Sequence, residues 1–303
     1  MGEMTRALVP WDDLRDAAPD LRIDVYDGVA APPGDVADVE LYVLPYAKDP
    51  GPALIAGMPN LRVLQTLNAG YEELLPLLPD GVTLCNGRGL HDASTAEHAL
   101  ALILAAQREF PRWVREQQAH RWTREHTGSL ADARVLIVGY GSIGAALDTR
   151  LQACEADVVK VARRARPEEG VHGVADLPGL LPEADVVVLI VPGGPSSSGM
   201  FGARELALLR DGALVVNIGR GPVLDTDALV AETASGRLRA ALDVVDPEPL
   251  PAGHPLWDSP GVFITPHVGG GSATFYPRAK RFVADQLRRF TEKRPLRNVV
   301  VQG

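Results

Sequence analysis

Hydrophobic and polar positions alternate in short blocks along the first hundred residues. The apolar runs there have strand length and are bounded by Gly, Pro, Asp or Asn: RALVP, RIDVYDG, VELYVLP, LRVLQTL and GVTLCN. The pattern predicts short strands that alternate with helices. Residues 94–118 differ, because apolar residues recur there at helical spacing over a long segment. We expect a long helix with Ser94 or Thr95 as its cap and with Pro111 bending or dividing it.

The pattern after residue 134 repeats the order strand, helix, strand. Its strand-like segments are RVLIVG, DVVKVARR, DVVVLIVP, ALVVNIG, RLRAALDVV and GVFITPH. Asp225 or Thr226 is a good helix cap, and Gly236 is placed as a helix stop. An amphipathic helix over 272–291 follows. Strands that alternate with short helices predict an α/β fold with parallel sheets covered on both faces.

Length and composition indicate a globular protein. The 303 residues are enough for two domains, and 46% hydrophobic with 23% charged residues is ordinary for such a fold. The longest apolar run, 186–192, is too short to cross a bilayer, and the N-terminus lacks the pattern of a signal peptide. Cys85 and Cys154 have no spacing typical of a disulfide framework or a zinc site. We therefore expect a cytoplasmic protein with no membrane partner and no metal.

The charge balance bears on possible partners. A formal net charge of -9 and a pI near 5.3 argue against a general nucleic-acid binder, which needs a concentrated basic surface. A local basic cluster at 163–166 stands out against this background. It is either a solvated face or a site for one small anion.

A glycine pattern marks a candidate cofactor site. Gly139, Gly141 and Gly144 have the spacing GxGxxG, directly after a predicted strand and at the start of a predicted helix. Such a turn brings the backbone close to a pyrophosphate, and N–H groups at the helix start hold the anion. The pattern predicts a dinucleotide site, and the alternative is a tight strand–helix turn without a ligand.

The end of the next strand normally carries a carboxylate that binds the adenosine ribose, about 18–20 residues further on. Counting 18 from Gly144 reaches Ala162, which is followed by Arg163 and Arg164, whereas Asp157 comes before the strand has begun. A 2′-phosphate suits this position, since charge-assisted hydrogen bonds contribute about 1.5–3 kcal/mol each. We predict a preference for NADP(H), with NAD possible if the arginines are merely solvated.

Arg220, Glu248 and His267 each follow a predicted strand, at the sheet edge where ligands bind. Each alone has a structural explanation, as a surface ion pair, a turn residue or a loop histidine. Together they suit hydride transfer to a 2-keto acid. Arginine offers a planar fork to the carboxylate, histidine protonates the oxygen, and glutamate holds the ring and favours its protonated form.

At this point the chain resembles the D-isomer-specific 2-hydroxyacid dehydrogenase family. The likeness lies in VLIVGYGSIG, LVVNIGRGPVLDTDAL, ALDVVDPEPLP and ITPHVGG, and extends to LRVLQTLNAGYEEL and STAEHALALILA. The resemblance implies that Arg220 binds the 2-keto or 2-hydroxy acid substrate, that Glu248 pairs with the histidine, and that His267 is the acid/base. It also implies that a loop offers backbone amides to the substrate carboxylate, namely Asn68, Ala69 and Gly70.

The resemblance further implies that Asp243 lies at the nicotinamide carboxamide, with Ile218 nearby. The expected cofactor contacts are Gly139, Gly141, Ser142, Ile143, Gly144, Arg163, Arg164, Val191, Pro192, Ile218, Arg220, Asp243, His267, Gly269 and Gly270. The chain departs from the family at 193–199, where GGPSSSG replaces a segment resembling PLTPET. Contacts of the serines there are not carried over.

The family's layout implies two Rossmann-like domains, with the cofactor domain inserted into the substrate domain. We expect a substrate domain of residues 1–97 and 275–303, a dinucleotide-binding domain of residues 98–274, and catalysis in a cleft that closes. A homodimer through the cofactor domain is also expected. Glyoxylate/hydroxypyruvate reductase-like specificity is one expectation, while Leu44, Tyr46, Leu90, Trp257 and Tyr276 are candidates for setting substrate size. The alternative function is a dinucleotide-sensing binding protein, similar to corepressors of this fold, which a turnover assay would distinguish.

Overall fold

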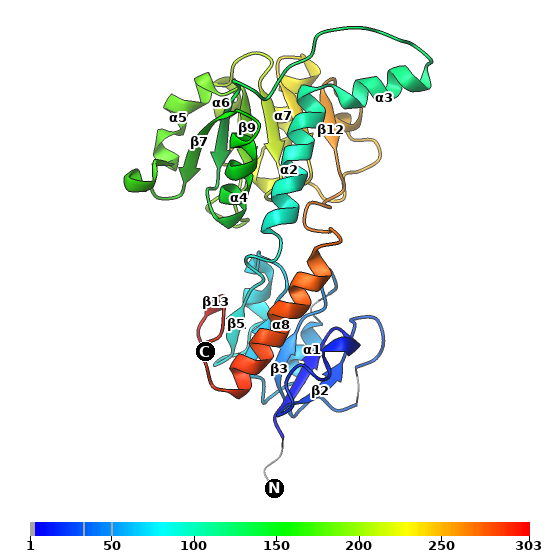
Figure 1. Ribbon diagram of the computed structural model, residues 1–303, viewed down its shortest axis with the longest axis vertical. Coiled ribbons are helices and arrows are strands. Elements are labelled where there is room, and N and C mark those ends of the chain that lie inside the picture. The colour runs from blue at the N-terminus through cyan, green and yellow to red at the C-terminus, as the bar shows by residue number, and fades with distance from the viewer. Residues whose placement is uncertain (1–3, 33, 50) are drawn as a thin grey trace. The chain divides into compact units, whose positions relative to one another are not determined.

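The computed structural model describes residues 4–32, 34–49 and 51–303, which form two compact units. The first unit comprises the described residues up to His91 together with Ala273–Gly303, and the second comprises Asp92–Ser272. Along the chain, the second unit is thus inserted into the first (Figure 1). The sequence had placed the two boundaries after residues 97 and 274.

The first unit contains a largely parallel sheet in the order β13-β5-β4-β3-β1-β2. Its strands are β1 (Arg6–Val9), β2 (Arg22–Val25), β3 (Val39–Val43), β4 (Val63–Gln65), β5 (Thr83–Cys85) and β13 (Val299–Val301). β13 was not expected from the sequence, and it pairs antiparallel with β5. The parallel part places the carboxyl ends of β1 to β5 at one edge.

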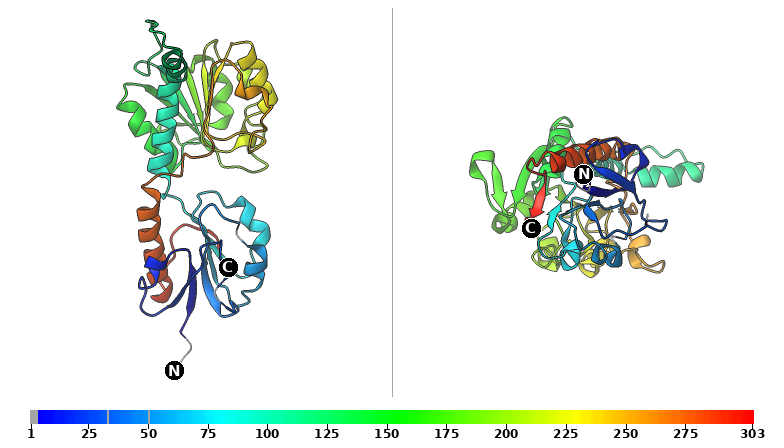
Figure 2. Two further views of the ribbon diagram at one scale, coloured as in Figure 1. Left: turned by 90° about the vertical axis from the view of Figure 1, so that its right-hand side faces the viewer. Right: turned by 90° about the horizontal axis from the view of Figure 1, so that it is seen from below.

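Helices cover both faces of this sheet, as the left view of Figure 2 shows. Ala7 and Val9 pack on one face with α8 (Phe275–Thr291) and the short turn η1 (Asp12–Leu14). Leu8 points to the other face, where α1 (Pro52–Ala56) and η2 (Glu72–Leu77) complete the core. This alternation is what a strand buried on both faces requires.

The second unit has a parallel sheet in the order β12-β11-β10-β9-β6-β7-β8. The strands are β6 (Arg134–Val138), β7 (Asp157–Ala162), β8 (Val171–Gly173), β9 (Val186–Leu189), β10 (Leu214–Asn217), β11 (Arg239–Leu242) and β12 (Val262–Ile264). The chain reverses its direction of progress between β6 and β9, the topological switch point where such sheets bind ligands. β7 begins at Asp157, so this residue lies within the strand and not before it, at the end far from the ligand edge.

Two helical layers enclose the second sheet. α2 (Asp92–Gln107) and α4 (Ser142–Gln152) pack on one face. α5 (Leu177–Leu180), α6 (Ala203–Ala207) and α7 (Thr226–Ala234) pack on the other. The remaining helical segments are α3 (Phe110–Gln118), η3 (Pro167–Glu169), η4 (Val174–Asp176), η5 (Leu181–Glu183), η6 (Gly221–Val223) and η7 (Pro255–Trp257). The α/β fold with parallel sheets in two domains is therefore confirmed.

The helix expected over 94–118 is divided, and its cap was predicted wrongly. α2 begins at Asp92, so Ser94 and Thr95 are buried in its first turn and do not occupy the N-cap position. The break lies at Glu109, which has a φ of 53°, and Pro111 sits in the first turn of α3, where its missing N–H costs nothing.

The cap predicted for α7 is confirmed. The side chain of Asp225 accepts a hydrogen bond of 2.9 Å from the backbone N–H of Ala228. Gly236 follows the helix with a φ of 73°, as a C-terminal stop requires.

Within the described ranges, no helix has both the length and the apolar composition needed to span a bilayer. The same residues contain no cluster of three or more His, Cys, Asp or Glu side chains that could hold a metal ion. Cys85 and Cys154 are both free thiols, and burial raises the pKa of the Cys85 thiol to about 11.

Candidate active site

The candidate residues of the second unit lie at one edge of its sheet. β6 leads into the turn at Gly139, and β10 leads to Arg220. β11 ends just before Asp243, and β12 ends three residues before His267. Because all these strands are parallel, the residues beyond their carboxyl ends share that edge.

The structure brings His267 and Glu248 together. His267 Nδ1 lies 2.6 Å from Glu248 Oε1, and the two side chains are 46% and 42% exposed. The acceptor is a carboxylate, so Nδ1 carries the hydrogen. Nε2 has no hydrogen-bond partner among the described residues. The ring is thus held from one side and presents its other nitrogen for chemistry.

The loop that carries His267 has a fixed backbone. His267 adopts a φ of 52°, a left-handed conformation that is uncommon outside glycine. Its N–H donates to the carbonyls of Asp243, at 2.8 Å, and Thr265, at 3.0 Å. The next two amides, of Val268 and Gly269, each donate to the Asp243 carboxylate at 2.9 Å. Asp243 therefore determines the path of the loop on both sides of the histidine ring.

A second histidine completes the surroundings of the buried Asp243. Thr265 Oγ1 donates to Asp243 Oδ1 at 2.6 Å, and His98 Nε2 lies 3.1 Å from the same oxygen and 2.9 Å from Thr265 Oγ1. Burial raises the pKa of Asp243, but hydrogen bonds from His98, Thr265 and the two loop amides outweigh it and lower the pKa to about 2. The carboxylate is therefore charged and engaged by the protein's own donors.

His98 and Thr265 were not identified as site residues from the sequence. His98 lies 167 residues before Thr265 along the chain, so no local sequence pattern joins the two residues.

Arg220 is positioned by a tightly packed turn. A side chain at Gly221 would place its Cβ 1.8 Å from the carbonyl oxygen of Val245, so only glycine fits there. Buried Asn217 donates to the Arg220 carbonyl at 3.0 Å. One guanidinium nitrogen of Arg220 donates to the Gly219 carbonyl at 2.8 Å. The other guanidinium donors have no partner among the described residues.

The glycine turn has the features that a pyrophosphate requires. Gly139 has a φ of 106°, and a Cβ there would lie 2.4 Å from the carbonyl oxygen of Ile190. The amides of Gly139 and Tyr140 both donate to the Val161 carbonyl, which ties the turn to β7. A Cβ at Gly141 would meet nothing within 4 Å, so the space beside it is open.

The start of α4 offers donors to this open space. No side chain caps the helix. At this helix start, three backbone amides have no hydrogen-bond partner among the described residues: those of Ser142, Ile143 and Gly144. These residues fit the pyrophosphate of a dinucleotide, because unpaired amides at a helix start attract anions.

The arginines after β7 differ in how they are engaged. Arg163 and Arg164 are exposed, and neither guanidinium has a partner in the described parts of the chain. Arg166 instead forms an ion pair of 2.9 Å with Glu169 and donates to the Tyr140 carbonyl at 3.1 Å. Only the first two arginines are therefore available to a ligand.

The other expected cofactor residues lie close to the same edge. Val191 and Pro192 follow β9, and the buried Ser197 hydroxyl donates to the Pro192 carbonyl at 2.7 Å. Ile218 is buried in the core beneath the edge. In the histidine loop, the Gly269 amide is taken by Asp243, and Gly270 comes next in the chain.

In the first unit, the predicted substrate loop follows β4. The Asn68 amide donates to Thr66 Oγ1 at 3.1 Å, so it is already engaged. The amides of Ala69 and Gly70 have no partner among the described residues. Two free amides in sequence form a suitable cradle for a carboxylate, whereas the third predicted donor is used by the fold.

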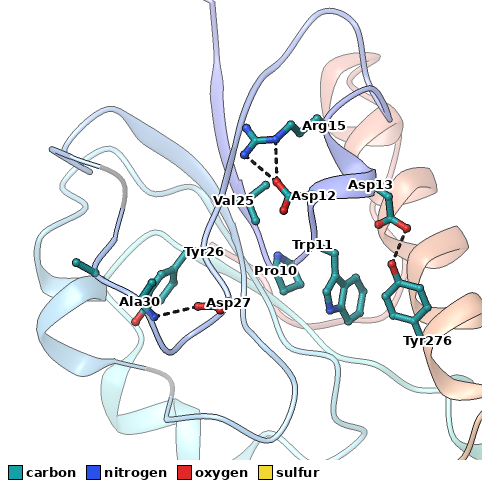
Figure 3. Close-up of a pocket in the computed structure, with 11 residues that line it drawn as sticks. Pro10, Trp11, Asp12, Asp13, Arg15, Val25, Tyr26, Asp27, Ala30 and Tyr276 are labelled. Carbon is teal, nitrogen blue, oxygen red and sulfur yellow. Dashed lines mark hydrogen bonds and ion pairs between the residues drawn. The ribbon is translucent and has the colours of Figure 1, made fainter.

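A separate pocket of about 500 Å³ lies at the carboxyl ends of β1 and β2 (Figure 3). Tyr276 points into it beside Trp11, with ring centroids 4.9 Å apart, and its hydroxyl donates to Asp13 at 2.5 Å. Asp12 binds Arg15, and the Asp27 carboxylate accepts backbone amides. The carboxylates that line this pocket are thus already engaged within the fold.

Comparison with known proteins is consistent with this geometry. The model of the D-isomer specific 2-hydroxyacid dehydrogenase NAD binding domain matches residues 100–269. Glyoxylate/hydroxypyruvate reductase B of Escherichia fergusonii is 35% identical over 232 residues, which cover 73% of this chain and 72% of that protein.

Solved structures resemble the whole chain. A D-isomer specific 2-hydroxyacid dehydrogenase from Xanthobacter autotrophicus Py2, in complex with NADPH and MES, is 31% identical. It has a TM-score of 0.84 over 99% of this chain and 98% of that one. An NADPH-dependent glyoxylate/hydroxypyruvate reductase from Sinorhizobium meliloti, in complex with NADP and sulfate, is 26% identical, with a TM-score of 0.84 over 98% of both chains. The chain belongs to the D-isomer specific 2-hydroxyacid dehydrogenases, a family of NAD(P)-dependent oxidoreductases.

Proposed function

We propose that this protein reduces a small 2-keto acid to the D-2-hydroxy acid with NADPH as the preferred cofactor. The observation that carries the proposal is the contact of 2.6 Å between His267 Nδ1 and Glu248 Oε1, with His267 Nε2 left without a partner among the described residues. This arrangement suits a general acid, because the ring is oriented and one nitrogen faces outward.

Each polar residue has a distinct part in the reaction. A bound dinucleotide would supply the hydride for the carbonyl carbon. His267 delivers a proton from Nε2 to the carbonyl oxygen, and Glu248 holds the imidazole through Nδ1–H and balances its positive charge. Arg220 binds the carboxylate and carbonyl oxygens of the substrate through its remaining guanidinium donors. The amides of Ala69 and Gly70 bind the carboxylate.

The cofactor preference rests on the end of β7. Arg163 and Arg164 present two exposed guanidinium groups at this strand end. A carboxylate, which is usual at this position, would repel the 2′-phosphate of NADPH. The NADP(H) complexes of the two structural neighbours support this preference. Unit Asp92–Ser272 is the proposed dinucleotide-binding domain, and the first unit is the proposed substrate domain.

The proposed substrates are small acids such as glyoxylate and hydroxypyruvate, on which two of the relatives act by name. The test is a panel of 2-keto acids, from glyoxylate to aromatic and branched acids, assayed with NADPH and with NADH. We expect NADPH oxidation with at least one small acid and a kcat/KM for NADPH about tenfold or more above that for NADH. Cofactor binding without oxidation by any acid would instead favour a dinucleotide sensor.

A homodimer in the cytoplasm is part of the same proposal. α3 has no buried residue, and Phe110, Val114 and Trp122 are 59%, 53% and 98% exposed. Large apolar side chains that gather on one surface segment are typical of an interface. Sedimentation should give a dimer, and replacing Phe110 and Trp122 by Ser should shift it toward monomer. A wild-type protein that sediments as a monomer at micromolar concentration would rule the dimer out.

A further inference from the structure

An arginine-lined cavity lies in the first unit, beside α8 and the segment before β13. Its volume is about 510 Å³, and its charged lining comes from Arg88, Arg278, Arg281 and Arg297. Buried Leu90 and Phe282 supply apolar surface to the same cavity. We name this feature the arginine cavity.

Most of these positive charges are not neutralised by the fold. Arg88, Arg278 and Arg281 have no ion-pair partner among the described residues. Arg297 lies 3.5 Å from the Asp285 carboxylate, which also forms a closer ion pair of 2.8 Å with Arg289. In a chain with a net charge of -9, these arginines form a local concentration of positive charge that attracts anions.

The backbone around the arginine cavity is fixed by buried and anchored polar groups. Gln286, only 1% exposed, accepts from the Arg297 amide at 2.8 Å and donates to the Arg297 carbonyl at 3.1 Å. Asn298 donates to the carbonyl of Arg88 at 2.8 Å. Arg278 and Arg281 stand three residues apart on α8, so their side chains emerge as neighbours. The guanidinium groups therefore converge from three segments with fixed backbones.

We propose that the arginine cavity binds a small organic anion that carries two or more negative charges as phosphate or carboxylate groups. Guanidinium groups bind both kinds of anion through paired N–H donors. The volume lies within the range of about 300–1,000 Å³ typical of small-molecule sites, and exceeds what one inorganic ion needs. The confinement of these arginines to one local depression also distinguishes it from the long basic stripe of a nucleic-acid site.

The arginine cavity is linked to the predicted substrate loop within the same unit. The amide of Gly87, next to Arg88, donates to the Asn68 carbonyl at 2.7 Å, and Asn86 donates to the Ala69 carbonyl at 2.6 Å. An anion held by Arg88 would therefore also fix the segment on which that loop rests. This consequence for turnover rests on the proposed function, whereas anion binding itself does not.

The test is calorimetric titration of the full-length protein with pyrophosphate and, separately, with citrate. NADPH is present at a saturating concentration so that the dinucleotide site does not compete. The variants are R278Q/R281Q and, on an independent segment, R88Q. The matched control is R288Q, which removes from the same helix an exposed arginine that has no ion pair with any described residue.

We expect the wild type to bind at least one probe, and R278Q/R281Q and R88Q each to weaken binding by about tenfold or more. R288Q should stay within about twofold of the wild type, because Arg288 does not line the arginine cavity. Tighter binding of pyrophosphate would identify a phosphate ligand, and tighter binding of citrate a polycarboxylate. The proposal would be overturned if neither probe bound at concentrations up to about 10 mM. It would also be overturned if R288Q weakened binding as much as the cavity variants do. Because binding is measured without turnover, this result is independent of whether the protein reduces keto acids.

Discussion

The loop after β12 and the loop after β7 lie at the same edge of one sheet, but they are built in opposite ways. In the first, His267 is held by Glu248 through its ring and by Asp243 through its backbone. In the second, Arg163 and Arg164 are exposed and have no partner among the described residues. A group that must transfer a proton benefits from a fixed geometry before the substrate arrives. A group that recognises a phosphate keeps its donors free until the ligand supplies the acceptor.

The largest effect should come from the fixed loop. Replacing His267 by Gln removes the proton donor, so we expect kcat for the best keto acid to fall about 10²–10⁴-fold. NADPH affinity should change little. Steady-state kinetics with NADPH measure the change, and His172→Gln is the control because His172 is half-exposed on β8. A variant with wild-type kcat would exclude His267 as the acid.

Glu248→Gln should give the next largest effect. The amide keeps the size of the side chain and an acceptor for Nδ1–H, but it removes the charge that balances the imidazolium. We expect kcat to fall on the order of 10²-fold, with KM for NADPH unchanged.

The double variant tests whether Glu248 acts through the histidine. Glu248→Gln combined with His267→Gln should be no slower than His267→Gln alone, because the two residues work as a unit. Fully multiplicative losses would show that Glu248 has an independent role.

The open loop should affect cofactor choice and not chemistry. Replacing Arg163 and Arg164 together by Ala should lower kcat/KM for NADPH about 10–100-fold, since charge-assisted hydrogen bonds to the 2′-phosphate are lost. NADH has no such phosphate, so its kcat/KM should change little. The control is Arg288→Ala, which removes an exposed arginine from α8 and not from the loop after β7. Equal losses of kcat/KM with NADPH and NADH would show that the two arginines do not recognise the 2′-phosphate.

The smallest effect concerns the carboxylate that fixes the histidine loop. The pKa of Asp243 is about 2, below its ordinary value, because hydrogen bonds outweigh burial. The charged carboxylate therefore contributes about 2 kcal/mol to the unfolding free energy above about pH 4. This contribution is lost as the pH falls toward 2.

This part of the stability should disappear in Asp243→Asn. Urea unfolding of both proteins at several pH values measures it, and the gap in unfolding free energy should narrow by about 2 kcal/mol between pH 6 and pH 2. A gap that is independent of pH would mean that the carboxylate charge does not hold the loop.

Local patterns were sufficient to predict most of the strands and the order of the site residues, but they did not predict β8 or β13. The GxGxxG turn and the residues after β10, β11 and β12 could be placed because parallel strands bring their carboxyl ends to one edge. The strand β13 was missed because the paired segment is only three residues long and its partner is distant along the chain. His98 was missed because its contact with Asp243 is tertiary. The hydrogen bond from Arg166 to the Tyr140 carbonyl could not be predicted either, because Tyr140 lies in another segment of the chain.

The contrast between the two loops is tested most directly by the dissociation constant of NADPH, measured by fluorescence titration on three proteins. These are the wild type, His267→Gln and the double variant of Arg163 and Arg164 to Ala. We predict that His267→Gln binds NADPH within about twofold of the wild type, while the arginine variant binds it about tenfold or more weakly. Unchanged binding by the arginine variant, or a greater loss in His267→Gln, would contradict the division between a loop fixed for chemistry and a loop left open for the cofactor.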